Sequence, residues 1–185
     1  MVAAVREAVS PRIAMIIEFH GRLSAPSALK MTRALEPFDP LWCEEPVAPE
    51  NIGLLAKVKA GTRIPISTRE RLYTLVDIYF LTRLRAADVV PMDIAHCGGI
   101  GASKMIASLA AVQDMRVAPH FSIGPGALAA ALHFDKSTPN FMIQEAFGEF
   151  DVPWRDALMS GWNPLRDGEL VHTRRRASVW TVTNV

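Results

Sequence analysis

Short apolar runs alternate with longer amphipathic stretches along most of this chain, and this alternation limits the folds that it can adopt. The apolar runs contain few polar residues, as a parallel β-strand covered by helices requires. The stretches between them have the periodicity of a helix with one apolar face. One such pair recurs about every 25 residues, which is enough for a strand, a loop, a helix and a return loop. The expected strands lie at 14–19, 41–45, 63–67, 87–93, 115–120 and 140–144.

Local signals mark the ends of the helices that connect these strands. Ser24 or Pro26 is suited to open the first helix, and Pro37 helps to end it. Pro49 is expected to open the second helix, and Gly61 stands just after it. The expected helices lie at 26–38, 49–61, 75–86, 100–114 and 124–137. The sequence therefore predicts one α/β unit of about six β/α repeats.

Each expected strand carries an acid or a histidine at its carboxyl end. These six residues, separated by 26, 26, 23, 27 and 25 positions, are Glu18, Glu44, Glu70, Asp93, His120 and Glu145. A (β/α) barrel brings all its strand ends to one mouth, where catalytic groups gather, whereas an open doubly wound sheet spreads them along a line. A partial TIM-type (β/α) barrel with one ring of acids and a histidine is therefore the predicted fold.

Three glutamates on neighbouring strands suggest a metal site. Glu18, Glu44 and Glu70 would supply hard oxygen ligands to one side of a divalent cation, leaving the other side for water and substrate. Mg²⁺ favours octahedral oxygen ligands and keeps several waters, so it is the expected ion. Glu45 follows Glu44 directly, so the period of two in a strand points it to the opposite face. Glu45 is predicted to be a structural acid or to support the ligands from behind.

The histidines at two strand ends suggest proton transfer. Asp93 is expected beside His120, where an acid fixes the tautomer of the imidazole and supports its protonated form, as a general base requires. His20 lies two residues after Glu18 and would share its face in an extended strand. One histidine would remove a proton while the other donates one to a leaving group. His133 and His172 are expected to be structural or exposed.

Charge and cysteine content exclude several kinds of partner and location. The chain has 20 Lys and Arg against 19 Asp and Glu, so its charge offers no reason to expect a nucleic acid or an anionic membrane as partner. Cys43 and Cys97 cannot build a disulfide framework, and a reduced, cytoplasmic location is expected. The sequence contains neither a signal-peptide core near its start nor the ~18 uninterrupted apolar residues of a membrane-spanning helix.

Six segments resemble the enolase superfamily in its mandelate racemase and muconate lactonizing enzyme branch. They are most similar to the D-galactonate dehydratase group of acid-sugar dehydratases. The segments read IIEFHGRLS, LEPFDPLWCEEPVAPEN, IPISTRERLYT, AADVVPMDIAHCGGI, RVAPHFSIGP and NFMIQE. They cover most of the span from Ile16 to Glu145, and their order and separations match as well as their letters.

The resemblance implies a reaction and a role for each strand-end residue. In this group three carboxylates bind Mg²⁺, which implies Glu18, Glu44 and Glu70. The histidine after the first ligand is a general acid, which implies His20, and a dyad with histidine as base implies Asp93 and His120. The last acid helps to bind the substrate or its enolate, which implies Glu145. The implied reaction removes the proton α to the carboxylate of a small sugar acid and expels the 3-hydroxyl as water, giving a 2-keto-3-deoxy acid.

The chain departs from that group in its extent and at one ligand. Glu18 stands where the group usually has Asp. Nothing in the sequence corresponds to the N-terminal capping domain or to the first two barrel strands, so residues 1–185 are expected to form a single incomplete C-terminal barrel domain. The sequence that follows GWNPLRDGEL also differs from the group.

An incomplete barrel has consequences for partners and for activity. Its open strand edges favour a homo-oligomer or a complement that supplies the missing strands. Two alternatives to a dehydratase stay open at this point. One is a non-catalytic truncated remnant of such an enzyme, and the other is a racemase or epimerase of the same superfamily.

Overall fold

A parallel sheet forms the centre of the structure, which we describe from a computed structural model for residues 1–122, 124–146, 165–166 and 169–171. Five strands are paired in chain order, each with the next along the sequence. They are β1 (Ile16–Glu18), β2 (Trp42–Glu44), β3 (Ile66–Ser67), β4 (Val89–Val90) and β5 (Arg116–Val117). Each lies inside a run that the sequence predicted to be a strand, and the predicted α/β fold is confirmed.

The sixth predicted strand also joins this sheet, although it forms only a single bridge. Phe141 pairs with Val117 in parallel. The Val117 amide donates to the Asn140 carbonyl at 3.0 Å, and the Met142 amide donates to the Val117 carbonyl at 2.9 Å. Among the described residues, six successive strand positions joined by five helices are thus present, in the order that the spacing predicted.

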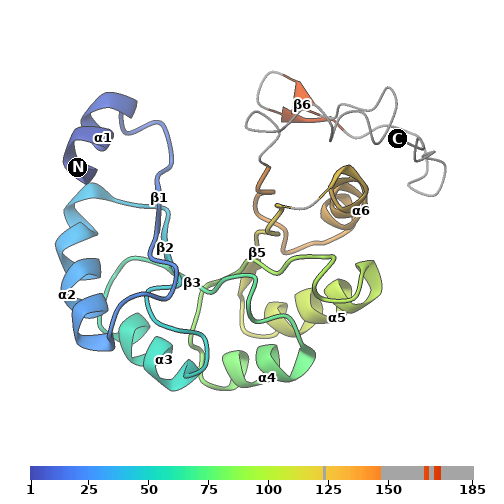
Figure 1. Ribbon diagram of the computed structural model, residues 1–185, viewed down its shortest axis with the longest axis horizontal. Coiled ribbons are helices and arrows are strands. Elements are labelled where there is room, and N and C mark those ends of the chain that lie inside the picture. The colour runs from blue at the N-terminus through green and yellow to red at the C-terminus, as the bar shows by residue number, and fades with distance from the viewer. Residues whose placement is uncertain (123, 147–164, 167–168, 172–185) are drawn as a thin grey trace.

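The connecting helices lie on the outer side of the curved sheet, so that the chain forms an open arc with its strands inside (Figure 1). They are α2 (Ala25–Leu35), α3 (Ile52–Ala60), α4 (Leu75–Arg83), α5 (Ile100–Ala111) and α6 (Pro125–Lys136). This is the arrangement of part of a (β/α) barrel. The sequence analysis did not predict α1 (Val2–Val9), the 3₁₀ turn η1 (Glu36–Phe38) or the antiparallel pair β6 (Leu165–Arg166) and β7 (Glu169–Leu170).

Side-chain caps decide where the first helices begin. Ser24 caps α2, and its hydroxyl accepts a hydrogen bond from the Ser27 amide at 3.4 Å. The prediction that Pro49 opens the next helix is wrong, because α3 begins only at Ile52. Asn51 caps it instead, and its side-chain oxygen accepts from the Leu54 amide at 3.1 Å. A capping side chain satisfies an amide that has no partner within the helix, which proline cannot do.

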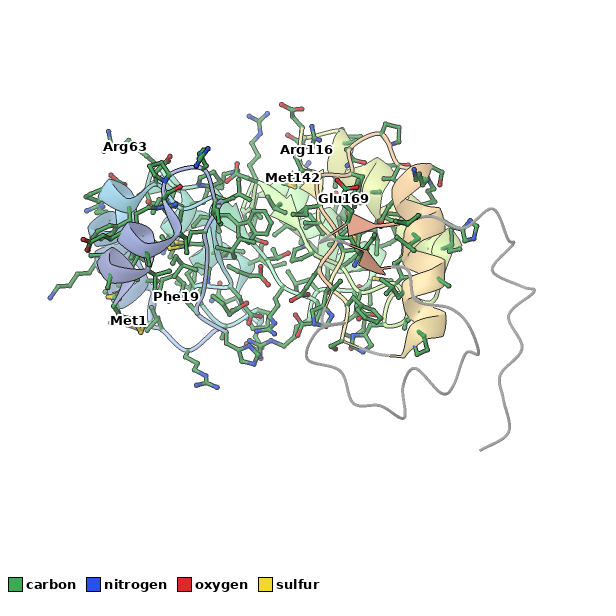
Figure 2. All side chains as sticks on the ribbon, turned by 90° about the horizontal axis from the view of Figure 1, so that it is seen from above. Met1, Phe19, Arg63, Arg116, Met142 and Glu169 are labelled. Carbon is green, nitrogen blue, oxygen red and sulfur yellow. The ribbon has the colours of Figure 1, made fainter. Side chains whose placement is uncertain are left out.

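The main core is formed by side chains of the sheet and of the outer helices. Figure 2 shows the described side chains on the ribbon. Ile66 of β3 is fully buried there, together with Ile78 of α4 and Phe134 of α6. The Lys104 ammonium lies 5.4 Å from the centre of the Phe134 ring and adds a cation–π contact. In the described part of the chain, no helix has both the length and the apolar character needed to cross a membrane.

Replacing Phe134 tests how much this core contributes. We expect Phe134→Ala to lower the free energy of unfolding by about 3–5 kcal/mol, because it leaves a cavity at a fully buried position. Phe80→Ala is the matched control, since Phe80 is 52% exposed and its loss should change stability by no more than about 0.5 kcal/mol. Urea unfolding followed by circular dichroism measures both. Equal losses in the two variants would contradict this account of the core.

Candidate active site

The register of the sheet brings the carboxyl ends of the strands to one level. Glu18 at the end of β1 pairs with Glu44 at the end of β2, and Glu44 in turn pairs with Ser67 of β3. Farther along the sheet, Asp93 and His120 form a parallel bridge beyond the ends of β4 and β5. Parallel strands in register place side chains that are far apart in sequence at the same end of the sheet.

Asp93 and His120 form a buried hydrogen-bonded pair. Oδ2 of Asp93 lies 2.9 Å from Nδ1 of His120, and the two residues are 2% and 8% exposed. The other Asp93 oxygen accepts hydrogen bonds from the amides of Ala95 at 2.8 Å and His96 at 3.1 Å. Asp93 is therefore fixed in place, and its bond to Nδ1 leaves Nε2 as the ring nitrogen available for proton transfer.

The electrostatics of this pair favour an ionised acid beside a basic imidazole. Burial lowers the pKa of His120, but the hydrogen bond to Asp93 and the charges of Glu145 and Glu70 outweigh it, so the pKa is raised on balance. Burial raises the pKa of Asp93, yet the hydrogen bonds from His120 and from the two amides hold the pKa below its usual value. Each partner thus stabilises the charged form of the other.

Glu145 lies on the Nε2 side of the same imidazole. Its Oε2 is 3.8 Å from Nε2 of His120 and accepts a hydrogen bond from the Phe121 amide at 3.2 Å. Burial raises the pKa of Glu145, against the opposing charges of His120 and Arg69. The structure thus brings Asp93, His120 and Glu145 together, from three successive β/α repeats.

Glu44 shows that this end of the sheet holds an excess of negative charge. Burial raises its pKa to about 8, and the neighbouring acids Glu18 and Glu145 act in the same direction. Against this, the Trp42 indole donates to Oε2 of Glu44 at 2.9 Å and lowers the pKa. Burial and the neighbouring acids thus both favour the neutral, protonated form of this carboxyl group while no cation is bound.

Arg69 supplies part of that positive charge, and the sequence analysis did not single it out. Its Nε donates to Oε2 of Glu70, and its NH1 lies 3.3 Å from Oε2 of Glu18. The side chain is only 16% exposed. The available signal was the Arg-Glu-Arg sequence at 69–71, which places a cation on each side of an expected ligand.

His20 and Glu45 both lie beside Glu18, because each stands in a turn just beyond the end of its strand and not within the strand. One ligand atom from each of Glu18, His20 and Glu45 lies within 4.8 Å of the other two. The prediction that Glu45 points to the opposite face is wrong, because β2 ends at Glu44 and Glu45 has φ 39°. His20, with φ 55°, likewise lies in a turn after β1. The alternation of a strand therefore applies to neither residue.

Glu45 is held by its own ion pair. It is buried, and its Oε1 accepts from Nε of Arg71 at 2.8 Å. Burial nevertheless raises its pKa on balance, although the Arg71 hydrogen bonds lower it. Arg71 also donates to the His20 carbonyl at 3.3 Å and so ties the turn that carries His20 to the loop that follows β2. This agrees with a structural role for Glu45.

The carboxylates at this end of the sheet fit a hard divalent cation in their chemistry. Glu18, Glu44 and Glu70 come from adjacent repeats and offer only oxygen, and the half-buried Glu44 has no neutralising cation among its described contacts. Among the described residues, however, the group whose ligand atoms all lie within 4.8 Å of one another is Glu18, His20 and Glu45, so the structure does not bring the three predicted ligands equally close. Mg²⁺ is bound in proteins by such oxygens together with water. Binding it through Glu18 and Glu70 requires that the Arg69 guanidinium give up its contacts to both.

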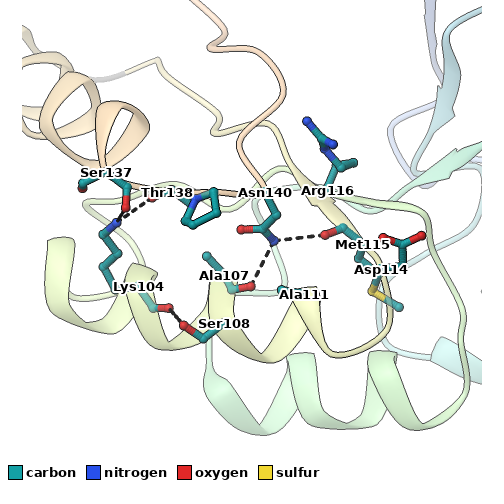
Figure 3. Close-up of a pocket in the computed structure, with 11 residues that line it drawn as sticks. Lys104, Ala107, Ser108, Ala111, Asp114, Met115, Arg116, Ser137, Thr138 and Asn140 are labelled. Atoms are coloured by element: carbon teal, nitrogen blue, oxygen red, sulfur yellow. Dashed lines mark hydrogen bonds between the residues drawn. The ribbon is translucent and has the colours of Figure 1, made fainter.

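A separate cavity of about 600 Å³ lies near the opposite ends of the strands, next to the start of β5 (Figure 3). The Asn140 amide there donates to the carbonyls of Ala107 and Met115, both at 3.0 Å. The Lys104 ammonium donates to Oγ1 of Thr138 at 2.9 Å. These polar groups already have partners, and the cavity contains none of the predicted site residues.

His172 lies outside the described residues.

The comparisons with known proteins agree with this architecture. A family model described as enolase C-terminal domain-like matches residues 1–176. A mandelate racemase/muconate lactonizing enzyme-like protein from Rubrobacter xylanophilus is 40% identical with a TM-score of 0.87, over 93% of this chain and 44% of that one. A mandelate racemase/muconate lactonizing enzyme from Jannaschia sp. is 33% identical with a TM-score of 0.90, over 98% and 46%.

A third solved structure carries a more specific description. It is an enolase from Agrobacterium radiobacter, provisionally described as a galactarate dehydratase, with sodium and L-malate bound. It is 35% identical with a TM-score of 0.75, over 78% of this chain and 37% of that one. This chain thus spans less than half the length of each of these three proteins. The matching family model, the partial barrel and the identities together show that the chain belongs to the enolase superfamily, among its mandelate racemase and muconate lactonizing enzyme-like members.

Proposed function

We propose that this chain carries the catalytic groups of a Mg²⁺-dependent acid-sugar dehydratase acting on a galactonate-like substrate. The reaction removes the proton α to the substrate carboxylate and eliminates the 3-hydroxyl as water, giving a 2-keto-3-deoxy acid. The observation that carries the proposal is the buried Asp93–His120 pair, 2.9 Å apart, beside a group of carboxylates at the same end of the sheet. Proton abstraction next to a carboxylate needs both a positioned base and a positive centre.

His120 is the proposed base. Its Nδ1 is engaged by Asp93, so the proton from the substrate is taken up at Nε2. Asp93 does not itself take the proton, since its oxygens are bonded to His120 and to two backbone amides and its pKa is held low. It orients the imidazole and stabilises the imidazolium that forms.

Glu18, Glu44 and Glu70 are the residues that would hold the metal. When bound, a divalent cation would polarise the substrate carboxylate and stabilise the negative charge that develops on it. Glu145 accepts from the Phe121 amide next to His120, so its carboxylate is placed to bind a substrate hydroxyl near the reacting carbon. His20, exposed in its turn beside Glu18, is the proposed acid that gives a proton to the departing hydroxyl.

Two features of one related protein support a sugar acid as the substrate. The similar enolase from Agrobacterium radiobacter is provisionally described as a galactarate dehydratase, and it holds L-malate, a hydroxy acid. Galactarate and L-malate both carry a hydroxyl on the carbon next to a carboxylate, which is the arrangement that the proposed reaction uses. The positively and negatively charged groups of this site could bind the carboxylate and hydroxyls of such a molecule.

The activity itself can be tested directly. We expect the chain with Mg²⁺ to convert at least one member of a panel of aldonates and galactarate to a 2-keto-3-deoxy acid, measured with a semicarbazide assay. Proton NMR in D₂O on the same samples reports exchange of the α-proton. Exchange without the keto acid would favour a racemase or epimerase instead, and neither signal with any substrate would reject the proposal for this chain.

Replacing the base gives a sharper result. We expect His120→Ala to abolish exchange of the α-proton, because the imidazole that Asp93 orients, and that would take up the proton at Nε2, is then missing. A loss of about 10²–10⁴-fold is typical of a general base. His133→Ala on α6 is the matched control and should exchange at the wild-type rate. Unchanged exchange in His120→Ala would reject its role as base.

Metal binding should depend on pH through Glu44. Burial raises the pKa of Glu44 from 4.5 to about 8, so below pH 8 the carboxyl must lose a proton before it can bind a cation. We expect the apparent affinity for Mg²⁺ to fall about tenfold per pH unit below that value. Isothermal titration calorimetry at pH 6, 7 and 8.5 measures it, and Glu44→Gln should abolish this dependence together with most of the affinity.

The same raised pKa predicts how the stability of the metal-free protein changes with pH. Because the pKa of Glu44 is raised in the folded state, its protonated form adds to the free energy of unfolding. This contribution is fully present below pH 4.5 and is lost as the pH rises through about 8. We expect the free energy of unfolding in EDTA to fall over this range, and to fall less in Glu44→Gln. An equal pH dependence in the two proteins, measured by urea unfolding, would contradict the assignment to Glu44.

A further inference from the structure

The guanidinium of Arg69 lies between two of the proposed metal ligands. Arg69 lies two residues beyond the end of β3, and its side chain extends across the ends of the strands rather than into solvent, being only 16% exposed. Its Nε donates to Oε2 of Glu70, and its NH1 lies 3.3 Å from Oε2 of Glu18. One positive group thus contacts carboxylates from two different β/α repeats.

The contact to Glu18 depends on charge more than on a well-formed hydrogen bond. NH1 of Arg69 is buried and has no hydrogen-bond partner among the described residues, although Glu18 is within ion-pair distance. A buried N–H without an acceptor costs free energy, so the attraction of the two carboxylates must hold the guanidinium there. Such a group can be replaced by another cation that satisfies the same oxygens.

We propose that Arg69 is a built-in cation that occupies the space between Glu18 and Glu70, and that a divalent metal binds there only when the guanidinium moves away. The inference deepens the proposed function, since it rests on Glu18 and Glu70 being metal ligands. Arg69 is then a competitor of the metal in the same chain, and it neutralises the carboxylates while no metal is bound.

The charges explain why both cations can be accommodated in turn. A guanidinium brings one positive charge and planar donors that suit carboxylates, whereas Mg²⁺ brings two charges and also attracts a third acid. Glu44 has no hydrogen bond or ion pair to Arg69, so part of the negative charge remains when the arginine is in place. A divalent cation can neutralise more of this charge than Arg69 can.

The displaced guanidinium has another acid within electrostatic reach. Burial raises the pKa of Glu145 on balance, while the positive charge of Arg69 acts in the opposite direction. Glu145 is thus a further acid that interacts electrostatically with Arg69. Only the fraction of molecules with Arg69 displaced can bind the metal. The smaller this fraction is, the weaker the apparent affinity for the metal becomes.

Removing the charge of Arg69 tests this competition. We expect Arg69→Gln to bind Mg²⁺ at least about tenfold more tightly than the unchanged chain in calorimetric titrations at pH 8.5. Arg63→Gln is the control, because Arg63 pairs with Glu36 away from the site, at 3.0 Å, and its loss changes the net charge equally. This control should bind Mg²⁺ as the unchanged chain does.

A second readout does not involve the metal. In EDTA, Arg69→Gln should unfold at a lower temperature than the unchanged chain, since Glu18 and Glu70 lose their shared cation, and added Mg²⁺ should remove this difference. Should Arg69→Gln fail to fold, Arg69→Lys keeps the charge but loses the planar fork, and we expect it to bind Mg²⁺ more tightly than the unchanged chain does.

The outcomes separate this inference from the proposed function. Equal Mg²⁺ affinities in the unchanged chain, Arg69→Gln and Arg69→Lys would overturn the competition and leave the metal site standing. Binding by Arg69→Gln alone would support it most strongly. Absence of Mg²⁺ binding in every folded variant would overturn the magnesium assignment itself, and the competition with it.

Discussion

Parallel pairing of short strands in register is the constraint on which this structure depends. Because β1 to β5 pair in chain order and each helix returns along the outside, every repeat brings its strand end to the same edge. Glu18 is thereby paired with Glu44, and Asp93 with His120. The concentration of ionisable groups at one edge follows from the topology, and each β/α repeat contributes to it.

This concentration of acids has an electrostatic cost that the chain offsets with its own cations. Arg69 lies against Glu18 and Glu70, Arg71 pairs with Glu45, and His120 is bonded to Asp93. Glu44 has no cation among its described contacts, and partial burial together with the neighbouring acids raises its pKa to about 8. The site thus combines groups whose charges are already balanced with one that remains poised for a further positive charge.

The larger features could be predicted from the sequence, because they depend on patterns that repeat. Apolar runs such as 41–45 and 115–120 each contain one strand, and Gly61 follows α3 as expected. Local choices were harder: Asn51 rather than Pro49 begins α3, and a positive φ turns Glu45 toward Glu18 instead of away from it. A period of two describes residues inside a strand, and these site residues stand just beyond its end.

The sequence by itself determined the alternation of strands and helices and the spacing of the strand-end residues, including the placement of Asp93 and His120 at the ends of successive strands. Periodicity and spacing are local properties that survive in any fold that buries the apolar runs. Only the tertiary structure decided that Arg69 spans Glu18 and Glu70, and that Arg71 holds Glu45. The reach of a long side chain across neighbouring strand ends depends on the curvature of the sheet and on the loops, which no spacing along the chain encodes.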